Sequence, residues 1–218
     1  MKLLLTSEGI TNPSIAKALL ELLGKPFEKS CVTYIPTAAN GEEGDKGWVN
    51  VNMDAIRDLG FLSFDVIDIS IESKAVWLPS FQKADVLVFG GGNVEYLLDW
   101  LETSGAKKVL PDLCKTRVYM GLSAGSMVAA KTISLSQTDM LYYEKTGKLE
   151  KRNGLGFVDF EIRPHLNSPD FPKVRLDYLG KLARQTPTTF YALDDASAIK
   201  VDGANISVVS EGKWKKFN

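Results

Sequence analysis

Short apolar runs alternate with segments of helical periodicity along the first 130 residues of the chain. This alternation is typical of an α/β protein, in which crossover helices cover both faces of a mostly parallel sheet. We expect strands at residues 2–7, 31–35, 64–69, 84–89 and 117–122, and helices at residues 12–24, 49–59, 94–101, 109–114 and 124–130. The chain is therefore predicted to form a three-layer α/β sandwich with a mostly parallel central sheet.

The pattern changes after residue 131. A strand is expected at residues 158–162, a helix at 174–184 and a strand at 189–193. Two further extended runs flank Asp202-Gly203, a dipeptide typical of tight turns, and predict an antiparallel β-hairpin near the C-terminus. Neither a repeat nor a linker-like change of composition interrupts the sequence, so residues 1–218 are expected to form a single domain.

Composition limits the partners and the chemistry. The 26 Lys and Arg residues nearly balance the 27 Asp and Glu residues, which argues against nucleic acid or a membrane surface as the main partner. Cys31 and Cys114 lie in apolar runs without metal-ligand spacing, and the first residues do not resemble a signal peptide, so a cytoplasmic location is expected. His165 is the only histidine, which excludes a zinc site with several histidine ligands. We expect no metal and no organic cofactor.

The segment Gly121-Leu122-Ser123-Ala124-Gly125 lies between an expected strand and an expected helix. A nucleophile elbow needs this context, because its tight turn tolerates only small residues on both sides of the serine. The helix N-terminus would stabilise developing negative charge, and the Ala124 amide would be one oxyanion donor. The alternative is a strand-to-helix turn whose glycines serve only close packing.

A second glycine-rich turn, Gly90-Gly91-Gly92-Asn93, follows the strand expected at 84–89. It matches neither the dinucleotide-binding fingerprint nor a phosphate-binding loop with lysine. One interpretation is a turn in which Asn93 is a helix N-cap. Alternatively, the amide of Gly91 or Gly92 completes an oxyanion hole beside Ser123, because both turns lie at the carboxyl edge of the sheet.

A serine nucleophile needs a base, and His165 is the only histidine that can supply one. It follows the strand expected at 158–162, between two prolines. The carboxylate that would orient its ring is less defined by sequence. Asp139 follows the elbow helix, whereas Asp194 and Asp195 stand at the end of the strand expected at 189–193.

Taken together, these motifs resemble the dipeptidase E (aspartyl dipeptidase) and cyanophycinase family. The matching segments, in the family's order, are Gly90-Gly91-Gly92-Asn93, Gly121-Leu122-Ser123-Ala124-Gly125, Thr138-Asp139-Met140, Pro164-His165 and Leu193-Asp194-Asp195 with Ala198-Ile199. The resemblance implies a fold like that of class I glutamine amidotransferase domains. It also implies Ser123 as nucleophile, His165 as general base, Gly91 and Ala124 as oxyanion donors, and Asp195 and Asp139 as acidic candidates, with Asp195 ranked first for contact with the imidazole.

The implied activity is that of a serine peptidase that cleaves small peptides through an acyl-enzyme, as a monomer or homodimer. Peptides with N-terminal Asp are the substrates that the resemblance suggests. However, Ser134-Leu135-Ser136 replaces the arginine expected in that region of aspartyl dipeptidases. The remaining candidates for substrate binding are Arg163, Lys131 and Asn93. For the two cations, the alternative is that they are solvated surface charges. The alternatives are an esterase or amidase with the same elbow and a ligand-binding protein without turnover.

Overall fold

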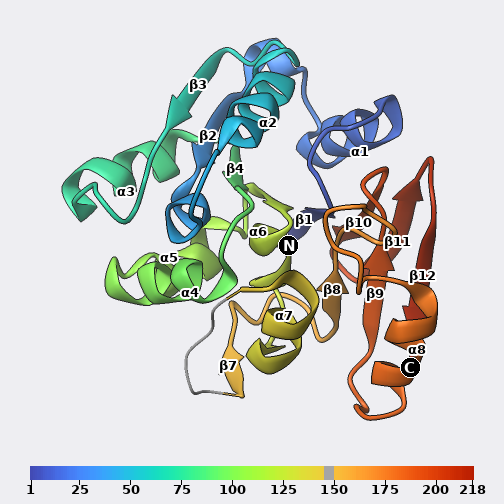
Figure 1. The fold of residues 1–218 in the computed structure, drawn as a ribbon. Coiled ribbons are helices and arrows are strands. Elements are labelled where there is room, and N and C mark those ends of the chain that lie inside the picture. Colours follow the sequence, from blue (N-terminus) through green and yellow to red (C-terminus); the bar gives the residue numbers. More distant parts are fainter. Residues whose placement is uncertain (145–149) are drawn as a thin grey trace.

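A seven-stranded sheet forms the centre of the protein in the computed structural model, which describes residues 1–144 and 150–218 (Figure 1). Its strands lie in the order β11 (Asn205–Ser210), β10 (Ser197–Asp202), β1 (Lys2–Thr6), β5 (Val118–Leu122), β4 (Val86–Phe89), β2 (Cys31–Ile35) and β3 (Ser63–Val66). The last five of these run parallel to one another, whereas β10 is antiparallel to β1 and to β11. The predicted α/β fold with a mostly parallel central sheet is confirmed.

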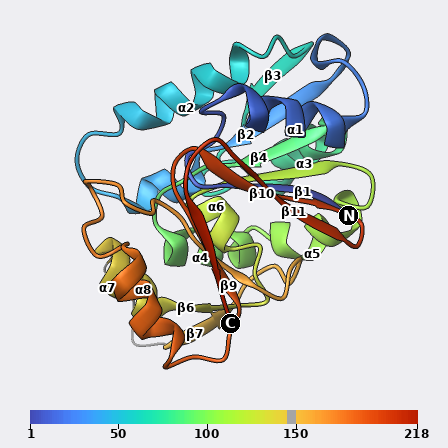
Figure 2. The same ribbon diagram turned by 90° about the vertical axis from the view of Figure 1, so that its right-hand side faces the viewer.

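Helices cover both faces of this sheet, because successive side chains of a strand point to opposite sides. Leu4 of β1 packs with the helices on one face, and Leu3 and Leu5 pack with those on the other. The first face carries α1 (Pro13–Leu23) and α2 (Gly47–Arg57); the second carries α3 (Lys74–Lys83), α4 (Val94–Thr103), α5 (Ala106–Leu113) and α6 (Ala124–Met127). Figure 2 shows α1 and α2 on one side of the sheet and α4, α5 and α6 on the other.

The remaining elements build a smaller region beside the parallel strands. They are η1 (Phe27–Lys29), η2 (Thr37–Gly41), β6 (Thr132–Ser134), α7 (Leu135–Tyr142), β7 (Lys151–Asn153), β8 (Glu161–Arg163), α8 (Leu176–Ala183), β9 (Phe190–Leu193) and β12 (Trp214–Phe217). Strands β12, β9 and β8 form a three-stranded sheet, and β6 pairs with β7. A separate apolar cluster joins Leu141 of α7, Leu179 of α8 and Phe190 of β9 with Leu166, and this cluster anchors the loop that carries His165.

Several elements depart from the predicted boundaries. Helix α3 was not predicted, since Pro79 lies inside it and hides the helical spacing of buried Trp77 and Phe81. Helix α6 ends at Met127 rather than at residue 130, because Ala130 instead forms a β-bridge with Val158. The elements β6, α7, β7 and β12 were not predicted either; β6, β7 and β12 are only three or four residues long.

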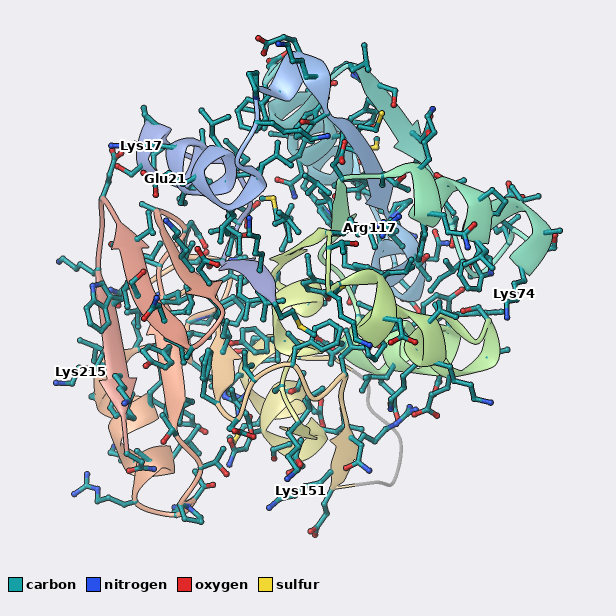
Figure 3. All side chains as sticks on the ribbon, turned by 180° about the vertical axis from the view of Figure 1, so that it is seen from behind. Lys17, Glu21, Lys74, Arg117, Lys151 and Lys215 are labelled. Atoms are coloured by element: carbon teal, nitrogen blue, oxygen red, sulfur yellow. The ribbon has the colours of Figure 1, made fainter. Side chains whose placement is uncertain are left out.

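Charged side chains occupy the outer surface. Figure 3 shows Lys17, Lys74, Lys151 and Lys215 at the periphery of the molecule. Lys17 and Glu21, one helical turn apart on α1, form an exposed ion pair of 4.0 Å, which stabilises the fold only slightly. In the described parts of the chain, no helix has the length and apolarity that would be needed to cross a bilayer.

Candidate active site

Ser123 lies in a strained turn between β5 and α6. Its φ of 46° and ψ of −109° fall outside the regions that non-glycine residues normally occupy. The flanking glycines are required by packing: a Cβ on Gly125 would lie 2.0 Å from the carbonyl oxygen of Phe89, and one on Gly121 would lie 2.5 Å from the amide nitrogen of Ser126. This is the geometry of a nucleophile elbow, with the serine at a helix N-terminus.

His165 is the residue that faces the Ser123 hydroxyl. It follows β8 in a loop, with a φ of 62°, and its side chain is buried. The Nε2 atom lies 2.9 Å from Oγ of Ser123, and the ring stacks on Phe171 with centroids 4.9 Å apart. The backbone amide of His165 donates a hydrogen bond of 2.7 Å to Oγ of Ser7. The stacking on Phe171 therefore fixes the ring and the bond to Ser7 fixes the backbone, with Nε2 directed at the serine.

Asp195 contacts the other ring nitrogen. Its Oδ1 lies 2.7 Å from Nδ1 of His165 and also accepts a hydrogen bond of 2.9 Å from Ser7. The topology explains this meeting: β10 is antiparallel to β1, so the residues before β10 lie at the edge where β1 ends. Burial would raise the pKa of Asp195, but the hydrogen bonds from His165 and Ser7 and the charge of the imidazole together hold it below its ordinary value.

The other two acidic candidates lie elsewhere. Asp139 is exposed on α7 and makes no hydrogen bond or ion pair with His165 in the described structure. Asp194 accepts hydrogen bonds from the Ser197 hydroxyl at 2.6 Å and from the Ala196 amide at 3.2 Å, so its carboxylate shapes the turn between β9 and β10. Of the three carboxylates considered from sequence, the structure brings Asp195 alone to the imidazole.

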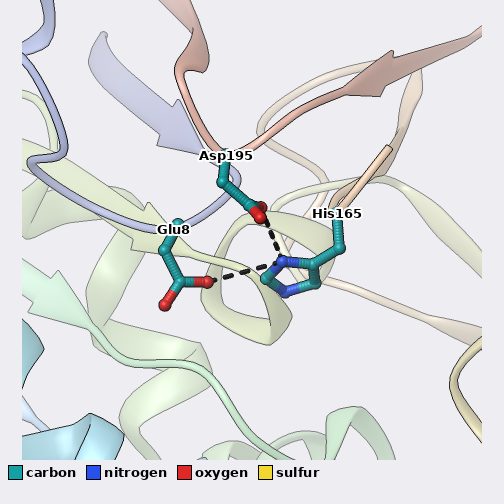
Figure 4. A group of neighbouring side chains, drawn as sticks. All are labelled: Glu8, His165 and Asp195. Atoms are coloured by element: carbon teal, nitrogen blue, oxygen red, sulfur yellow. Dashed lines mark hydrogen bonds and ion pairs between the residues drawn. The ribbon is translucent and has the colours of Figure 1, made fainter. Parts of the chain in front are cut away.

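Glu8 is a second carboxylate beside His165 that the sequence analysis missed. Its Oε2 lies 3.4 Å from Nδ1, and Figure 4 shows Glu8 and Asp195 directed at the same ring nitrogen. Burial raises the pKa of Glu8, the imidazole charge lowers it, and the nearby Asp195 and Asp170 raise it further. The available signal was its position just after the first expected strand, at the same sheet edge as Ser123.

Glu8, His165 and Asp195 also form the one group within the described residues whose ligand atoms could hold a metal ion. These atoms lie within 4.8 Å of one another. The nitrogen that faces the carboxylates is Nδ1, which already makes the short contact with Asp195, while Nε2 faces Ser123. The arrangement thus matches an oriented general base, in which a carboxylate fixes the imidazole and the free nitrogen accepts a proton.

The two glycine-containing turns meet at Ser123. A Cβ on Gly91 would lie 3.3 Å from Cβ of Ser123, so this residue approaches the serine closely. Gly92 has a φ of 125°, and a Cβ there would lie 2.4 Å from backbone atoms of Ala38, which requires glycine. Within residues 1–144 and 150–218, the amides of Gly91, Gly92 and Ala124 donate no hydrogen bond to the protein. These amides are available to a ligand bound at the serine.

The three weaker candidates for substrate binding are not among the residues that line the cavity beside Ser123. Asn93 caps α4, because its Oδ1 accepts a hydrogen bond of 2.9 Å from the Tyr96 amide. Arg163 is buried and pairs with Glu161 at 2.5 Å, and it also donates to Gln137. The interpretation of Arg163 as a solvated charge is therefore wrong, and the residue is not among those that line the cavity beside Ser123. Lys131 lines a different, smaller hollow beyond α6.

A cavity of about 580 Å³ opens beside Ser123 and His165. Its acidic lining residues are Glu8, Glu42, Glu43, Glu144, Asp170 and Asp195. Glu144 is only 7% exposed, and burial raises its pKa to about 8; a hydrogen bond from the Val94 amide counteracts this, and neighbouring acidic groups reinforce it. The cavity has room for a small peptide, and its lining combines these carboxylates with aromatic, apolar and neutral polar residues.

Comparison with known proteins agrees with this geometry. An uncharacterized peptidase of Listeria monocytogenes is 31% identical over 180 residues, which cover 80% of this chain and 83% of that protein. Peptidase E of a Nostoc species is 27% identical over 163 residues, which cover 70% of this chain and 62% of that protein. A solved structure of a candidate peptidase E from Listeria monocytogenes superposes with a TM-score of 0.76 at 27% identity, covering 97% of this chain and 98% of that one.

The family match extends over nearly the whole chain. Residues 3–209 match peptidase family S51, so the match includes both glycine turns, Ser123, His165 and Asp195. The chain belongs to peptidase family S51, the dipeptidase E and cyanophycinase family, and is a serine peptidase.

Proposed function

We propose that the chain hydrolyses small peptides with Ser123 as nucleophile, His165 as general base and Asp195 as the residue that orients the imidazole. One observation carries this proposal: a continuous hydrogen-bonded series links Asp195 to Nδ1 of His165 at 2.7 Å and Nε2 to Oγ of Ser123 at 2.9 Å. A carboxylate in this position selects the tautomer with the proton on Nδ1, which leaves Nε2 free to accept the serine proton.

The reaction proceeds in two halves. Oγ of Ser123 attacks the scissile carbonyl carbon while Nε2 of His165 takes the hydroxyl proton. The C–N bond then breaks, the leaving amine takes that proton, and an ester remains on Ser123. A water molecule, deprotonated by the same nitrogen, attacks the ester, and the serine hydroxyl is restored as the acid product leaves. Throughout, Asp195 stabilises the protonated imidazole.

The negative oxygen formed in each half faces the free amides around Ser123. We assign the Ala124 amide as one donor, because it begins helix α6 directly after the nucleophile. Gly91 is the second donor, since its Cα lies next to the Ser123 side chain, and Gly92 is the alternative one residue further on. Removal of one such donor in serine peptidases typically costs about 10²–10³ in kcat.

The same proposal includes two statements about the fold. We infer that residues 1–218 act as one domain and that the architecture is of the class I glutamine amidotransferase kind. In support, five parallel strands carry the nucleophile after β5, with helices on both faces. Strands β10 and β11 extend the sheet beside β1 and place Asp195 at its carboxyl edge.

The test combines labelling with turnover. A fluorophosphonate probe should label the wild type and not Ser123→Ala, and a panel of dipeptides should be hydrolysed only by the wild type. Equal peptide turnover by both proteins would overturn the mechanism. Hydrolysis of p-nitrophenyl esters without cleavage of any peptide would instead favour an esterase. Stable peptide binding without labelling or turnover would favour a ligand-binding protein.

A further inference from the structure

The cavity beside Ser123 carries a strong local charge imbalance. Six carboxylate side chains line it, and among its described lining residues His165 is the only basic side chain. The whole chain has a net charge of only −1, so the described lining of the cavity is more negative than the chain as a whole. A concave site with one sign of charge raises the local concentration of ligands of the opposite sign.

Glu144 is the most deeply buried of these carboxylates. Only 7% of the residue is exposed, although it lines the cavity. Its Oε2 accepts the amide hydrogen bond of Val94 at 2.9 Å, which is the hydrogen bond that holds this carboxyl in the described structure. Among the described residues, the charged groups that act on it, led by Glu42, are negative. Burial raises the pKa of this carboxyl to about 8, so in the empty cavity it is protonated near neutral pH. A cationic ligand in the cavity would lower this pKa and stabilise the ionised carboxylate.

Glu42 stands on the neighbouring wall, in a position fixed by close packing. It follows η2, where a Cβ on Gly41 would lie 2.7 Å from Cβ of Tyr96, so this turn fits tightly against the start of α4. Burial raises the pKa of Glu42, and a hydrogen bond from the Asn93 side chain and the charge of Lys46 partly offset this. Glu42 and Glu144 thus both flank the beginning of α4 and line the same cavity as Ser123.

We propose that Glu42 and Glu144 bind a cationic group of the peptide substrate, so that the enzyme prefers peptides with an ammonium or guanidinium group next to the scissile bond over peptides with N-terminal Asp. This inference rests on the proposed peptidase function and names the substrate class of that site. An N-terminal Asp side chain would add another carboxylate to the cavity. Arg163, the cation nearest in sequence to His165, cannot pair with it because it is buried against Glu161.

The cation has two possible sources, the free α-ammonium group of the peptide and a basic N-terminal side chain. Two matched pairs of substrates separate them: lysyl-leucine against norleucyl-leucine, and norleucyl-leucine against its N-acetyl form. The proposal predicts that the charged member of at least one pair has a kcat/KM higher by about tenfold or more, the usual scale of a charge-assisted contact. Aspartyl-leucine should be a poorer substrate than norleucyl-leucine.

The variants identify the residues responsible. In the double variant Glu42→Gln/Glu144→Gln, the preference for the charged over the uncharged substrate should fall below about threefold. Glutamine keeps the shape of the side chain and the Val94 contact but not the charge. Glu72→Gln removes an exposed carboxylate that does not line the cavity and should retain the wild-type preference. Should the double variant not fold, the single variants Glu42→Gln and Glu144→Gln provide the same comparison, each lowering the preference.

Two outcomes would overturn the inference: rate ratios near one for both pairs in the wild type, or a preference that survives in the double variant. Labelling of Ser123 by a fluorophosphonate keeps this failure separate from failure of the peptidase function. An enzyme that is labelled and cleaves norleucyl-leucine as fast as lysyl-leucine, with no effect of acetylation, remains a serine peptidase without this specificity. A protein that is neither labelled nor active fails the proposed function itself.

Discussion

The hydroxyl of Ser7 donates a hydrogen bond of 2.9 Å to the Asp195 carboxylate. The same oxygen accepts the backbone amide of His165 at 2.7 Å, so a single side chain after β1 connects the proposed base with the carboxylate that orients it. Ser7 is fully buried and touches neither the imidazole nitrogens nor Ser123 through its hydroxyl. We therefore regard it as a positioning residue.

Ser7→Ala should lower kcat about tenfold with little change in KM, since it loosens the Asp195–His165 pair without altering the cavity wall by more than one atom. The hydrogen bond from Ser7 lowers the pKa of Asp195, so the pKa of this carboxyl should rise in the variant. Steady-state kinetics and an NMR titration of Asp195 would test both effects. An unchanged kcat together with an unchanged Asp195 pKa would contradict the assignment, and Ser7→Thr should restore part of the activity.

Asp195→Asn should reduce kcat/KM by about 10²–10⁴, because an amide cannot hold the tautomer of His165 that leaves Nε2 free. The matched control is Asp139→Asn, which removes an exposed carboxylate from α7 that makes no contact with the imidazole. Peptide hydrolysis by the two purified variants gives the comparison directly. If Asp139→Asn lost activity and Asp195→Asn kept it, the orienting residue would have been assigned wrongly.

Much of this site follows from local pattern. The strand–Gly-x-Ser-x-Gly–helix segment dictates the strained turn at Ser123. Because the chain has one histidine, His165 is the only histidine that can act as the base. The choice of Asp195 over Asp139 does not follow in the same way. It depends on β10 pairing antiparallel with β1, a contact between residues nearly 200 positions apart that no periodicity encodes.

The cavity wall was the hardest part to predict. The polar segment at residues 41–47 has the composition of a surface loop, yet Gly41 packs against α4 and carries Glu42 to the cavity. Burial is likewise invisible in sequence: Arg163 reads as an accessible cation beside His165, whereas its side chain is enclosed with Glu161. Such charges are assigned correctly only once tertiary packing is known.

Gly125→Ala should destabilise the protein by about 3 kcal/mol or more, because the new methyl group would lie 2.0 Å from the carbonyl oxygen of Phe89 and neither backbone can move freely. Gly180→Ala is the matched control. Gly180 lies inside α8, where a Cβ would meet only Phe217 at 3.8 Å, so alanine should stabilise the helix by about 0.5–1 kcal/mol. Denaturant unfolding measures both changes, and equal stabilities would refute the steric argument for the elbow.

Glu144 should make the stability of the protein depend on pH. Its pKa is about 8 in the folded state against an ordinary value of 4.5, so between these values the folded chain binds more protons than the unfolded chain. The contribution of Glu144 to the free energy of unfolding must then fall as pH rises from about 4.5 through about 8. Glu144→Gln removes this loss while preserving an acceptor for the Val94 amide.

The variant and the wild type should therefore be similarly stable at pH 4, where Glu144 is protonated in both states, and should diverge as pH rises. By pH 9 the variant should be more stable on the order of 3 kcal/mol, since each unit of pKa shift corresponds to about 1.4 kcal/mol and relaxation of the cavity reduces the full effect. Urea unfolding at four or five pH values measures the divergence. Parallel stability curves for the two proteins would show that Glu144 ionises in the folded protein as it does in the unfolded chain. The cation-binding proposal would then lose the buried carboxyl group on which it depends.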